Sequence, residues 1–349
     1  MHRTSDFDYE LPPSLIAQHP LPDRAASRLL VLQRVGGAIR HAQFRDLVDL
    51  VAPEDVLVLN GSRVIPARLR GTRVPGRGAR GPGGAAEVLL VRALPDGTWL
   101  GMGHPGGKLK PGRRVAFGDD SAVEIVAMLG GGLRRVKFVG ALDAGATLAK
   151  YGEMPLPPYI RRPPRPDDRE RYQTVYAVHD GSVAAPTAGL HFTRHLLEHV
   201  RARGTAVAML DLHIGPGTFK PVEVENLADH PLHAEAYAVS EEAAATINQR
   251  REAGGRTWAV GTTVVRALEA CADERGAIRA ATGETSLFIH PPYPFRTVDR
   301  LLTNFHLPRS TLLMLVCAFG GYEHVMRAYR DAIAQGYRFY SYGDAMAIM

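Results

Sequence analysis

The pattern that most constrains the fold is an alternation of strand-length and helix-length segments after about residue 190. In the clearest example, Ser240 caps a predicted helix at 241–252, which ends in two glycines before an apolar strand at 257–260. The other predicted helices lie at 194–203, at 263–273, from about 310, and at 323–335, and the other predicted strands at 205–214, 285–289, 298–305 and 337–342. Such alternation is typical of α/β architecture.

A different pattern occupies the region before residue 153. Buried and half-exposed strands are predicted at 56–59 and 64–70, and residues 71–84 have the Gly, Pro and Arg content of a loop. Strand-sized pieces follow at 86–93, 98–101, 114–117, 122–128 and 134–138, with turn residues between them. Short strands separated by turns predict a small antiparallel β-barrel or sandwich. We therefore expect residues 67–152 to be inserted into an α/β catalytic domain made of residues 1–66 and 153–349, with a proline-rich connector after Tyr151.

Charge and apolar runs restrict the class of protein. The net charge of +6 agrees with an anionic partner but is common among enzymes that bind no nucleic acid. The two cysteines, Cys271 and Cys317, have no metal-ligand spacing and favour a reducing compartment. The amino-terminal segment lacks the apolar region of a signal peptide, and the longest apolar run, 312–319, is too short to cross a bilayer. We expect a cytoplasmic monomer that does not enter a membrane.

Two polar residues interrupt the apolar strand predicted at 205–214. Asp211 and His213 are two residues apart, so they share one face of the strand. The glycine turn at 215–217 would leave them near the carboxyl end of that strand, where open α/β sheets bind ligands. A carboxylate beside an imidazole can orient a proton-transfer group and raise its basicity. A surface ion pair or a hydrogen-bonded core histidine would give the same pattern.

Three further segments could bind a ligand. The sequence at 304–311 ends a predicted strand and begins a predicted helix. At this helix start, His306, Arg309 and the cap Ser310 could hold an anion or a polar ligand. Helix capping alone would also explain Ser310. Residues 260–266 form a strand–glycine–helix junction that could bind a carboxylate or phosphate, but they lack the dinucleotide fingerprint and such turns are common. The small residues at 181–192 would admit a flat ligand such as a nucleobase, or would serve tight packing.

Histidine spacing does not favour a metal. His191, His195 and His199 recur every four residues with Glu198 nearby, but the zinc motif H-E-x-x-H is absent, and His191 lies outside the predicted helix cap. A second group, formed by His230, His233 and Glu235, lacks a further ligand of clear spacing. We therefore predict no metal, and we assign both groups to solvated surface, structure or substrate contacts.

Basic residues cluster in two stretches. The arginines at 63, 68, 70, 73, 77 and 80 have no acidic residue between them, and Arg161, Arg162 and Arg165 follow beside Tyr159. Contact with nucleic-acid phosphates and a solvated loop explain this composition about equally well.

Taken together, these motifs closely resemble one family, the S-adenosylmethionine:tRNA ribosyltransferase-isomerases of queuosine biosynthesis. The most specific strings are NFHLPRST at 304–311 and AAPTAGLHFT at 184–193. LNGSRVIPAR at 59–68, LHIGPGTF at 212–219, GTTVVR at 261–266 and FYSYGDAM at 339–346 agree with them. Glu153, Met154, Leu232 and Pro292 depart from the usual family pattern.

The resemblance implies a barrel-like α/β main domain with an inserted antiparallel β-barrel. It implies that S-adenosylmethionine is a consumed ribosyl donor, that no other cofactor is needed, and that 7-aminomethyl-7-deazaguanine at the wobble position of a tRNA is the acceptor. Epoxyqueuosine, adenine and methionine would be the products.

On this basis we assign three sets of residues. The catalytic candidates are Asp211, His213 and His306, because a base must remove a proton from the ribose carbon beside the sulfonium. The S-adenosylmethionine-binding candidates are Thr187, Gly189, Leu190, His191, Phe192, Thr262, Thr263, Arg266 and Arg309. The tRNA-binding candidates are Arg63, Arg68, Arg70, Arg73, Arg161 and Arg162.

Two other functions fit parts of the sequence. An S-adenosylmethionine-dependent RNA methyltransferase would be expected to carry a glycine-rich motif after an early strand, and none is found here. A non-catalytic tRNA-binding module would not need Asp211 or His306 in apolar strands, where an idle polar group is costly to bury. Release of free adenine distinguishes the three possibilities.

Overall fold

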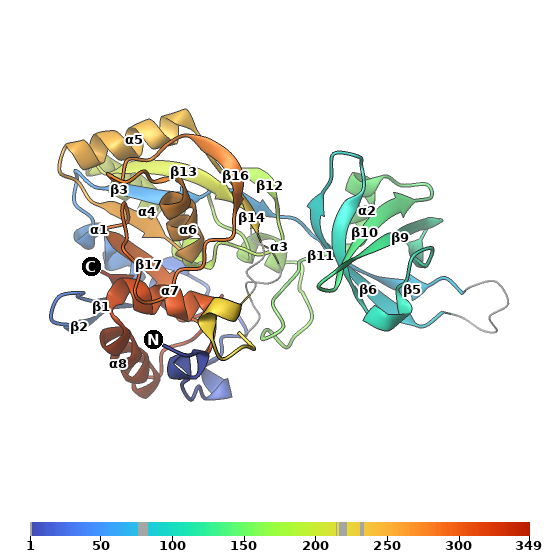
Figure 1. The fold of residues 1–349 in the computed structure, drawn as a ribbon, viewed down its shortest axis with the longest axis horizontal. Helices are drawn as coiled ribbons and strands as arrows, with labels where there is room; N and C mark the ends of the chain where they lie inside the picture. The colour runs from blue at the N-terminus through green and yellow to red at the C-terminus, as the bar shows by residue number, and fades with distance from the viewer. Residues whose placement is uncertain (1, 76–82, 214, 216–221, 231–233) are drawn as a thin grey trace.

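A nine-stranded sheet forms the centre of the larger of two lobes in the computed structural model, which describes residues 2–75, 83–213, 215, 222–230 and 234–349 (Figure 1). Four neighbouring strands run parallel through its middle: β13 (Ala206–Leu212), β3 (Val56–Asn60), β15 (Thr257–Val260) and β17 (Arg300–Asn304). On one side lie β14 (Glu235–Val239) and β16 (Ala281–Thr285), and on the other β18 (Ala345–Ile348), β1 (Arg28–Leu32) and β2 (Ile39–Gln43). The predicted mixed α/β class is confirmed.

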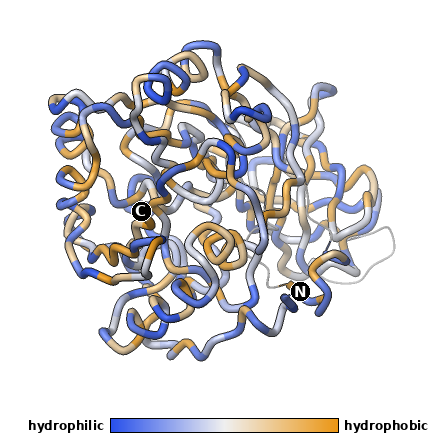
Figure 2. The backbone as a smooth tube through the Cα atoms, turned by 60° about the vertical axis from the view of Figure 1, so that its left-hand side comes forward, coloured by the Kyte–Doolittle hydropathy of each residue, from blue (hydrophilic) through white to orange (hydrophobic). Residues whose placement is uncertain are grey.

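Helices cover both faces of this sheet, so each strand contributes to two cores. In β1, Leu30 and Leu32 belong to one core, whereas Leu29 and Val31 belong to the other. The first core is completed by α5 (Glu241–Glu252), α6 (Thr262–Cys271), α7 (Thr311–Gly320) and α8 (Tyr322–Ala334), and the second by α1 (Leu47–Leu50) and α4 (Arg194–Ala202). Burial on both faces explains why β3 is buried at every position. Hydrophilic segments recur along the outer turns (Figure 2).

The smaller lobe is an antiparallel barrel. Its strands are β5 (Arg68–Arg73), β6 (Ala85–Ala93), β7 (Trp99–His104), β8 (Arg114–Gly118), β9 (Ser121–Gly130) and β10 (Leu133–Val139). Because β5 pairs with both β6 and β8, the ring of strands closes on itself. Alternate residues such as Val88, Leu90 and Ile125 fill its interior.

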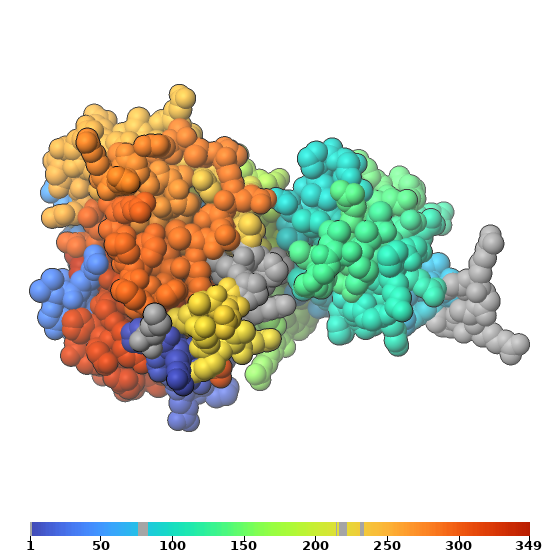
Figure 3. Space-filling view, in the orientation of Figure 1, coloured from blue at the N-terminus to red at the C-terminus, as the bar shows by residue number. Residues whose placement is uncertain are grey.

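Short elements join the two lobes, and the molecule is narrower where they meet (Figure 3). The chain leaves the larger lobe through β4 (Ser62–Val64). At the end of the barrel lobe, α2 (Ala144–Tyr151) packs on the barrel core and β11 (Gly152–Glu153) pairs with β5. The chain then passes through α3 (Asp168–Arg171) to β12 (His179–Ser182), which pairs in parallel with β4. An ion pair of 2.6 Å between Arg92 in β6 and Glu284 in β16 also links the lobes.

Several predicted elements are found where the sequence placed them. Thr193 accepts a hydrogen bond from the backbone N–H of Leu196 at the start of α4, and Ser240 accepts one from Ala243 at the start of α5. The strand pieces of the barrel are also present, each within a few residues of its predicted bounds. The elements that were not predicted include β1, β2, β12, β14, α1, α2 and α3.

Three strand predictions are wrong in place or extent. The strand expected at 64–70 is divided, because Pro66 has no N–H to donate, and β4 ends at Val64 before β5 begins at Arg68. The strand expected at 285–289 lies earlier, as β16. Residues 337–342 form no strand: Tyr340 has a left-handed φ of +71°, and Phe339 packs on Phe305 with ring centroids 5.0 Å apart. The last strand is β18 instead.

The barrel-like arrangement expected for the larger lobe is not confirmed. The strand order runs linearly from β16 to β2, and no pairing joins these two edge strands in the part of the chain that the structure describes. Among the described helices, none combines the length and apolar character needed to cross a membrane.

Candidate active site at the carboxyl edge of the main sheet

Strand direction brings polar segments from distant parts of the chain to one edge of the main sheet. The four parallel strands all end there, which places Asn60, Asp211, Gly261 and Asn304 along the same edge. β18 runs antiparallel to β17, and β1 runs parallel to β18, so the segments that precede β18 and β1 reach the edge as well. This edge is therefore the place where the predicted motifs meet.

Asp211 forms its ion pair with a histidine that the sequence did not single out. Its Oδ2 lies 2.7 Å from Nδ1 of His179 in β12, a side chain that is 64% exposed. The other carboxylate oxygen, Oδ1, and Nδ1 of His213 are buried without a hydrogen-bond partner in the structure. Burial lowers the pKa of His213, although the nearby Asp211 opposes this shift. The two groups are thus available at the edge, but the carboxylate orients His179 and not His213.

Asn60 and Gly181 position this group. The Asn60 side chain donates to the carbonyl of Leu212 at 2.9 Å and accepts from the backbone N–H of Leu212 at 3.2 Å, which fixes the end of β13. Gly181 has a φ of +138°, and a Cβ at this position would lie 3.0 Å from the His213 ring. Only glycine lets the backbone of β12 lie so close to that ring.

His306 is buried directly after β17. Its Nε2 lies 2.8 Å from Oγ1 of Thr303, its backbone N–H donates to the hydroxyl of Tyr329 at 3.0 Å, and its carbonyl accepts from the hydroxyl of Tyr9. Burial lowers the pKa of His306 to about 3. The imidazole is therefore neutral near pH 7, the form that can accept a proton.

His191 is held more tightly. Its Nδ1 lies 2.6 Å from Oγ of Ser27, its Nε2 lies 3.2 Å from the amide nitrogen of Asn304, and its ring stacks on Phe44 with centroids 4.9 Å apart. Burial lowers its pKa to about 3, and Arg338 and Arg24 contribute to the shift. Both ring nitrogens already have partners, so His191 links the segment before β1 to the end of β17.

Tight packing, one of the two purposes left open by the sequence, accounts for several residues of the small-residue segment around His191. Thr187–His191 forms the short 3-10 helix η6 at the edge. Within it, a Cβ on Gly189 would lie 2.1 Å from the hydroxyl of Tyr176, so tight packing explains that glycine. Phe192 is fully buried against Phe44 and Tyr176, and packing accounts for its position too.

The remaining predicted S-adenosylmethionine contacts differ in what they do. Arg266 is buried in an ion pair with Glu235 and donates to the carbonyl of Leu287 at 3.1 Å, so its guanidinium ties α6 to β14. Thr262 and Thr263 begin α6 after Gly261, whose φ is +98°, and Oγ1 of Thr263 is buried without a hydrogen-bond partner. Arg309 has a φ of +55° and lies 3.9 Å from Glu225.

Most of the predicted tRNA-binding arginines are engaged with partners distant in sequence. Arg68 lies 3.2 Å from Glu87, and Arg70 contacts Glu87 at 3.2 Å and Glu153 at 3.4 Å. Arg63 lies 3.7 Å from Asp180, and Arg162 lies 2.6 Å from Asp168. Arg73 donates to the carbonyl of Gly84 at 3.3 Å, and Arg161 is exposed. Arg77 and Arg80 lie outside the described residues.

The histidine groups considered for a metal are separated. His191 lies in η6, whereas His195 and His199 are exposed on α4 with ring centroids 6.4 Å apart. His230 packs against Phe288, and His233 lies outside the described residues, as do Ile214 and Pro216–Gly217 of the predicted turn.

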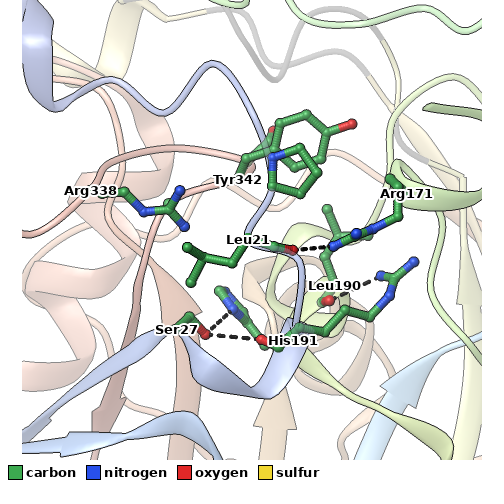
Figure 4. A pocket seen from close by; sticks show the side chains of 11 residues that line it. Leu21, Ser27, Arg171, Leu190, His191, Arg338 and Tyr342 are labelled. Atoms are coloured by element: carbon green, nitrogen blue, oxygen red, sulfur yellow. Dashed lines mark hydrogen bonds between the residues drawn. The ribbon is translucent and has the colours of Figure 1, made fainter. Parts of the chain in front are cut away.

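A pocket beside His191 was not predicted from the sequence. It measures about 290 Å³, including the part open to solvent, and its wall carries three arginines. Figure 4 shows Arg338 and Arg171 on opposite sides of the pocket, with Ser27 and His191 below them in this view. The full lining consists of Pro20, Leu21, Arg24, Ser27, Arg171, Leu190, His191, Arg338, Ser341, Tyr342 and Gly343.

Comparison with known proteins covers nearly the whole chain. The family model described as queuosine biosynthesis protein matches residues 4–348. A protein from Symbiobacterium thermophilum named S-adenosylmethionine:tRNA ribosyltransferase-isomerase is 52% identical over 99% of this chain and 100% of its own length. One of the same name from Moorella thermoacetica is 51% identical with the same coverage. The crystal structure of the S-adenosylmethionine tRNA ribosyltransferase from Thermotoga maritima has 38% identity and a TM-score of 0.56 over 99% of this chain and 100% of that one.

Proposed function

The chain belongs to the queuosine biosynthesis protein family, and on that premise we propose that it transfers and isomerises the ribosyl moiety of S-adenosylmethionine onto 7-aminomethyl-7-deazaguanine at the wobble position of a tRNA. The products are epoxyqueuosine in the tRNA, free adenine and methionine. S-adenosylmethionine is consumed as a substrate, and we propose no other cofactor.

The observation that carries the proposal is the convergence of the family-like motifs at one edge of the main sheet. Asp211 and His213 lie at the end of β13, and Asn304 and His306 at the end of β17. His191 of η6 contacts Asn304 and also Ser27, which precedes β1. These segments are far apart in sequence but share one edge of the sheet, which supports the proposal that one bound substrate contacts them.

The chemistry needs groups of this kind. The sulfonium acidifies the neighbouring ribose carbon, and a base must take the proton that this carbon releases. His213 and His306 are neutral imidazoles and Asp211 is a partly buried carboxylate, so each can accept it. A second proton must reach adenine as its bond to the ribose breaks, and the acceptor amine must attack in its neutral form. We assign the proton transfers to these three residues as a group.

The test combines purified protein, S-adenosylmethionine and tRNA that carries the aminomethyl base. We expect adenine and methionine in equal amounts, and mass spectrometry of the digested tRNA should show the added cyclopentane-epoxide group. A methyl-sized gain with S-adenosylhomocysteine would instead identify a methyltransferase. Binding of tRNA without release of adenine would indicate that the protein is a non-catalytic tRNA-binding module.

A further inference from the structure

Three guanidinium groups line the pocket beside His191, and none of them has a carboxylate partner. Arg24, Arg171 and Arg338 come from three separate segments of the chain. Within the described residues, no carboxylate oxygen lies within 4.0 Å of any of the three guanidiniums. Asp344, which lies near Arg338, pairs with Arg28 at 3.2 Å and accepts the backbone N–H of Arg338. The pocket therefore carries three guanidiniums that form no direct ion pair within the described residues.

Backbone carbonyls hold these side chains in place. Arg24 donates to the carbonyls of Leu190 at 3.0 Å and Glu170 at 2.8 Å, Arg171 to those of Leu21 and Pro22, and Arg338 to that of His19 at 3.2 Å. A carbonyl dipole orients a guanidinium but does not neutralise it. Burial lowers the pKa of Arg24 and Arg338, although Glu170 opposes the shift at Arg24 and Asp344 opposes it at Arg338. Nε of Arg171 is buried without a hydrogen-bond partner.

The floor of the pocket is polar, buried and uncharged. Ser27 and His191, which lie below the arginines in Figure 4, are each less than 5% exposed, and the ring nitrogens of His191 already contact Ser27 and Asn304. An anion in the pocket would thus meet positive charge at the walls and hydrogen-bonding groups at the floor, without a carboxylate to repel it.

We propose that this pocket binds a phosphodiester group of the tRNA, next to the base that is modified. This assignment rests on the proposed function. Asn304, which contacts His191 of the pocket lining, ends β17, and His306 follows two residues later, so the pocket adjoins the chain segment that carries this catalytic candidate.

The charge of the pocket favours a phosphodiester over the amino-acid end of S-adenosylmethionine. That end carries an ammonium group on the carbon that bears its carboxylate, and the ammonium would face three guanidiniums with no acidic residue in the lining.

The pocket also differs from the arginines that the sequence singled out. Arg63, Arg68, Arg70 and Arg162 lie beside carboxylates, which a phosphate would have to displace. Arg24, Arg171 and Arg338 need no such displacement.

The experiment measures tRNA affinity by fluorescence anisotropy over a range of salt concentrations for Arg338→Gln, Arg338→Lys and Arg256→Gln. Arg256 precedes β15 and so lies at the opposite edge of the sheet, which makes it a control for the same change of charge. We expect the slope of log affinity against log salt to become shallower by about 0.7–0.9 in Arg338→Gln only. Arg338→Lys retains the charge and should keep the slope. An unchanged slope in folded Arg338→Gln would overturn the proposal.

Two further measurements separate the sources of the anion. Equilibrium dialysis of S-adenosylmethionine should give the same affinity for Arg338→Gln and the wild type. A loss of this affinity alone, with an unchanged salt slope for tRNA, would assign the pocket to the carboxylate of the cosubstrate.

The second measurement uses anticodon-arm RNA in which single phosphates are replaced by neutral methylphosphonates. One such linkage should weaken binding to the wild type but not to Arg338→Gln. Purely additive losses of affinity at every linkage would contradict the proposal. These binding results do not depend on adenine release, so they remain decisive if the proposed reaction is wrong.

Discussion

At the scale of single residues, burial sets the protonation of two histidines at the carboxyl edge of the main sheet. His191 and His306 each have a pKa lowered to about 3 by burial, and both rings have hydrogen-bond partners that fix their orientation. The two differ in how those partners are distributed. Both ring nitrogens of His191 contact other side chains, which indicates a structural role. In His306, the ring contact with a side chain is the one between Nε2 and Oγ1 of Thr303.

His306→Ala should lose turnover by far more than it loses stability. A structural histidine would contribute about one hydrogen bond, so its removal should lower the free energy of unfolding by roughly 1–3 kcal/mol. Loss of a general base should lower single-turnover adenine release by about a hundredfold or more. Thr303→Val, which removes the hydrogen bond but keeps the imidazole, is the matched control. Near-normal release from folded His306→Ala would move the catalytic role to Asp211 and His213.

Acid should destabilise the protein through these same two histidines. Their folded-state pKa of about 3 lies below the ordinary value of 6.5, so the unfolded state binds more protons between these values. Stability should therefore be fully present above pH 6.5 and fall as pH decreases below it, by about 1.4 kcal/mol per pH unit for each histidine. Urea unfolding between neutral and mildly acidic pH measures this slope. His306→Gln should remove the contribution of one histidine to this slope. Equal slopes in His306→Gln and the wild type would contradict the assignment.

At the scale of elements, one buried ion pair joins α6 to the β14 side of the sheet. Arg266 and Glu235 are 6% and 5% exposed, and Arg266 also donates to the carbonyls of Leu287 and Thr285. Glu235 accepts the backbone N–H of Gly215 at 3.1 Å, which extends the connection to the segment after β13. The sequence motif GTTVVR therefore contains a structural arginine, whatever else the start of α6 does.

Arg266→Met should be strongly destabilising. Removing one member of a buried pair leaves the other charge without compensation, which costs about 3–5 kcal/mol. Urea unfolding of Arg266→Met, Glu235→Leu and the double variant forms the test. The double variant should lose less than the sum of the two single variants. Additive losses would show that the two side chains do not depend on each other.

At the scale of the whole molecule, the barrel lobe is attached beside the carboxyl edge of the main sheet. β4 and β12 lie at this junction, and β12 supplies His179 to the Asp211 carboxylate. We propose that residues 67–152 act as an inserted domain that extends the tRNA-binding surface. The arginines of β5 belong to it, and their ion pairs are partly exposed, with side-chain exposures of 16% for Arg68 and 49% for Arg70.

Neutralising Arg68, Arg70 and Arg73 together should weaken tRNA binding and leave the fold intact. Exposed ion pairs are typically worth about 0–1 kcal/mol, so an RNA phosphate can displace Glu87 or Glu153. Each lost phosphate contact should make the salt dependence shallower by about 0.7–0.9. Glu87→Gln is the matched control and should not reduce the slope. If the folded triple variant keeps the slope of the wild type, these arginines serve the barrel and not the RNA.

The sequence by itself determined most of the local structure. Caps at Thr193 and Ser240, the glycines that follow the helices, and the apolar runs at 56–59 and 257–260 act through neighbours a few residues away, so their effects can be predicted from nearby residues. The end-to-end resemblance likewise determined the family, because the matched strings are long and specific. Local pattern failed where packing outweighed it, as at 337–342, where aromatic contacts with Phe305 replace the expected strand.

Only the tertiary structure decided which side chains meet. The arginine series around residue 68 has no acid between its members in sequence, yet Glu87 and Glu153 reach it through strand pairing in the barrel. Asp211 contacts His179 because β12 lies beside the end of β13, and Arg24, Arg171 and Arg338 share a pocket although their segments are far apart. The physical reason is that charge compensation and burial depend on distances in space, and strand order in the sheet sets those distances.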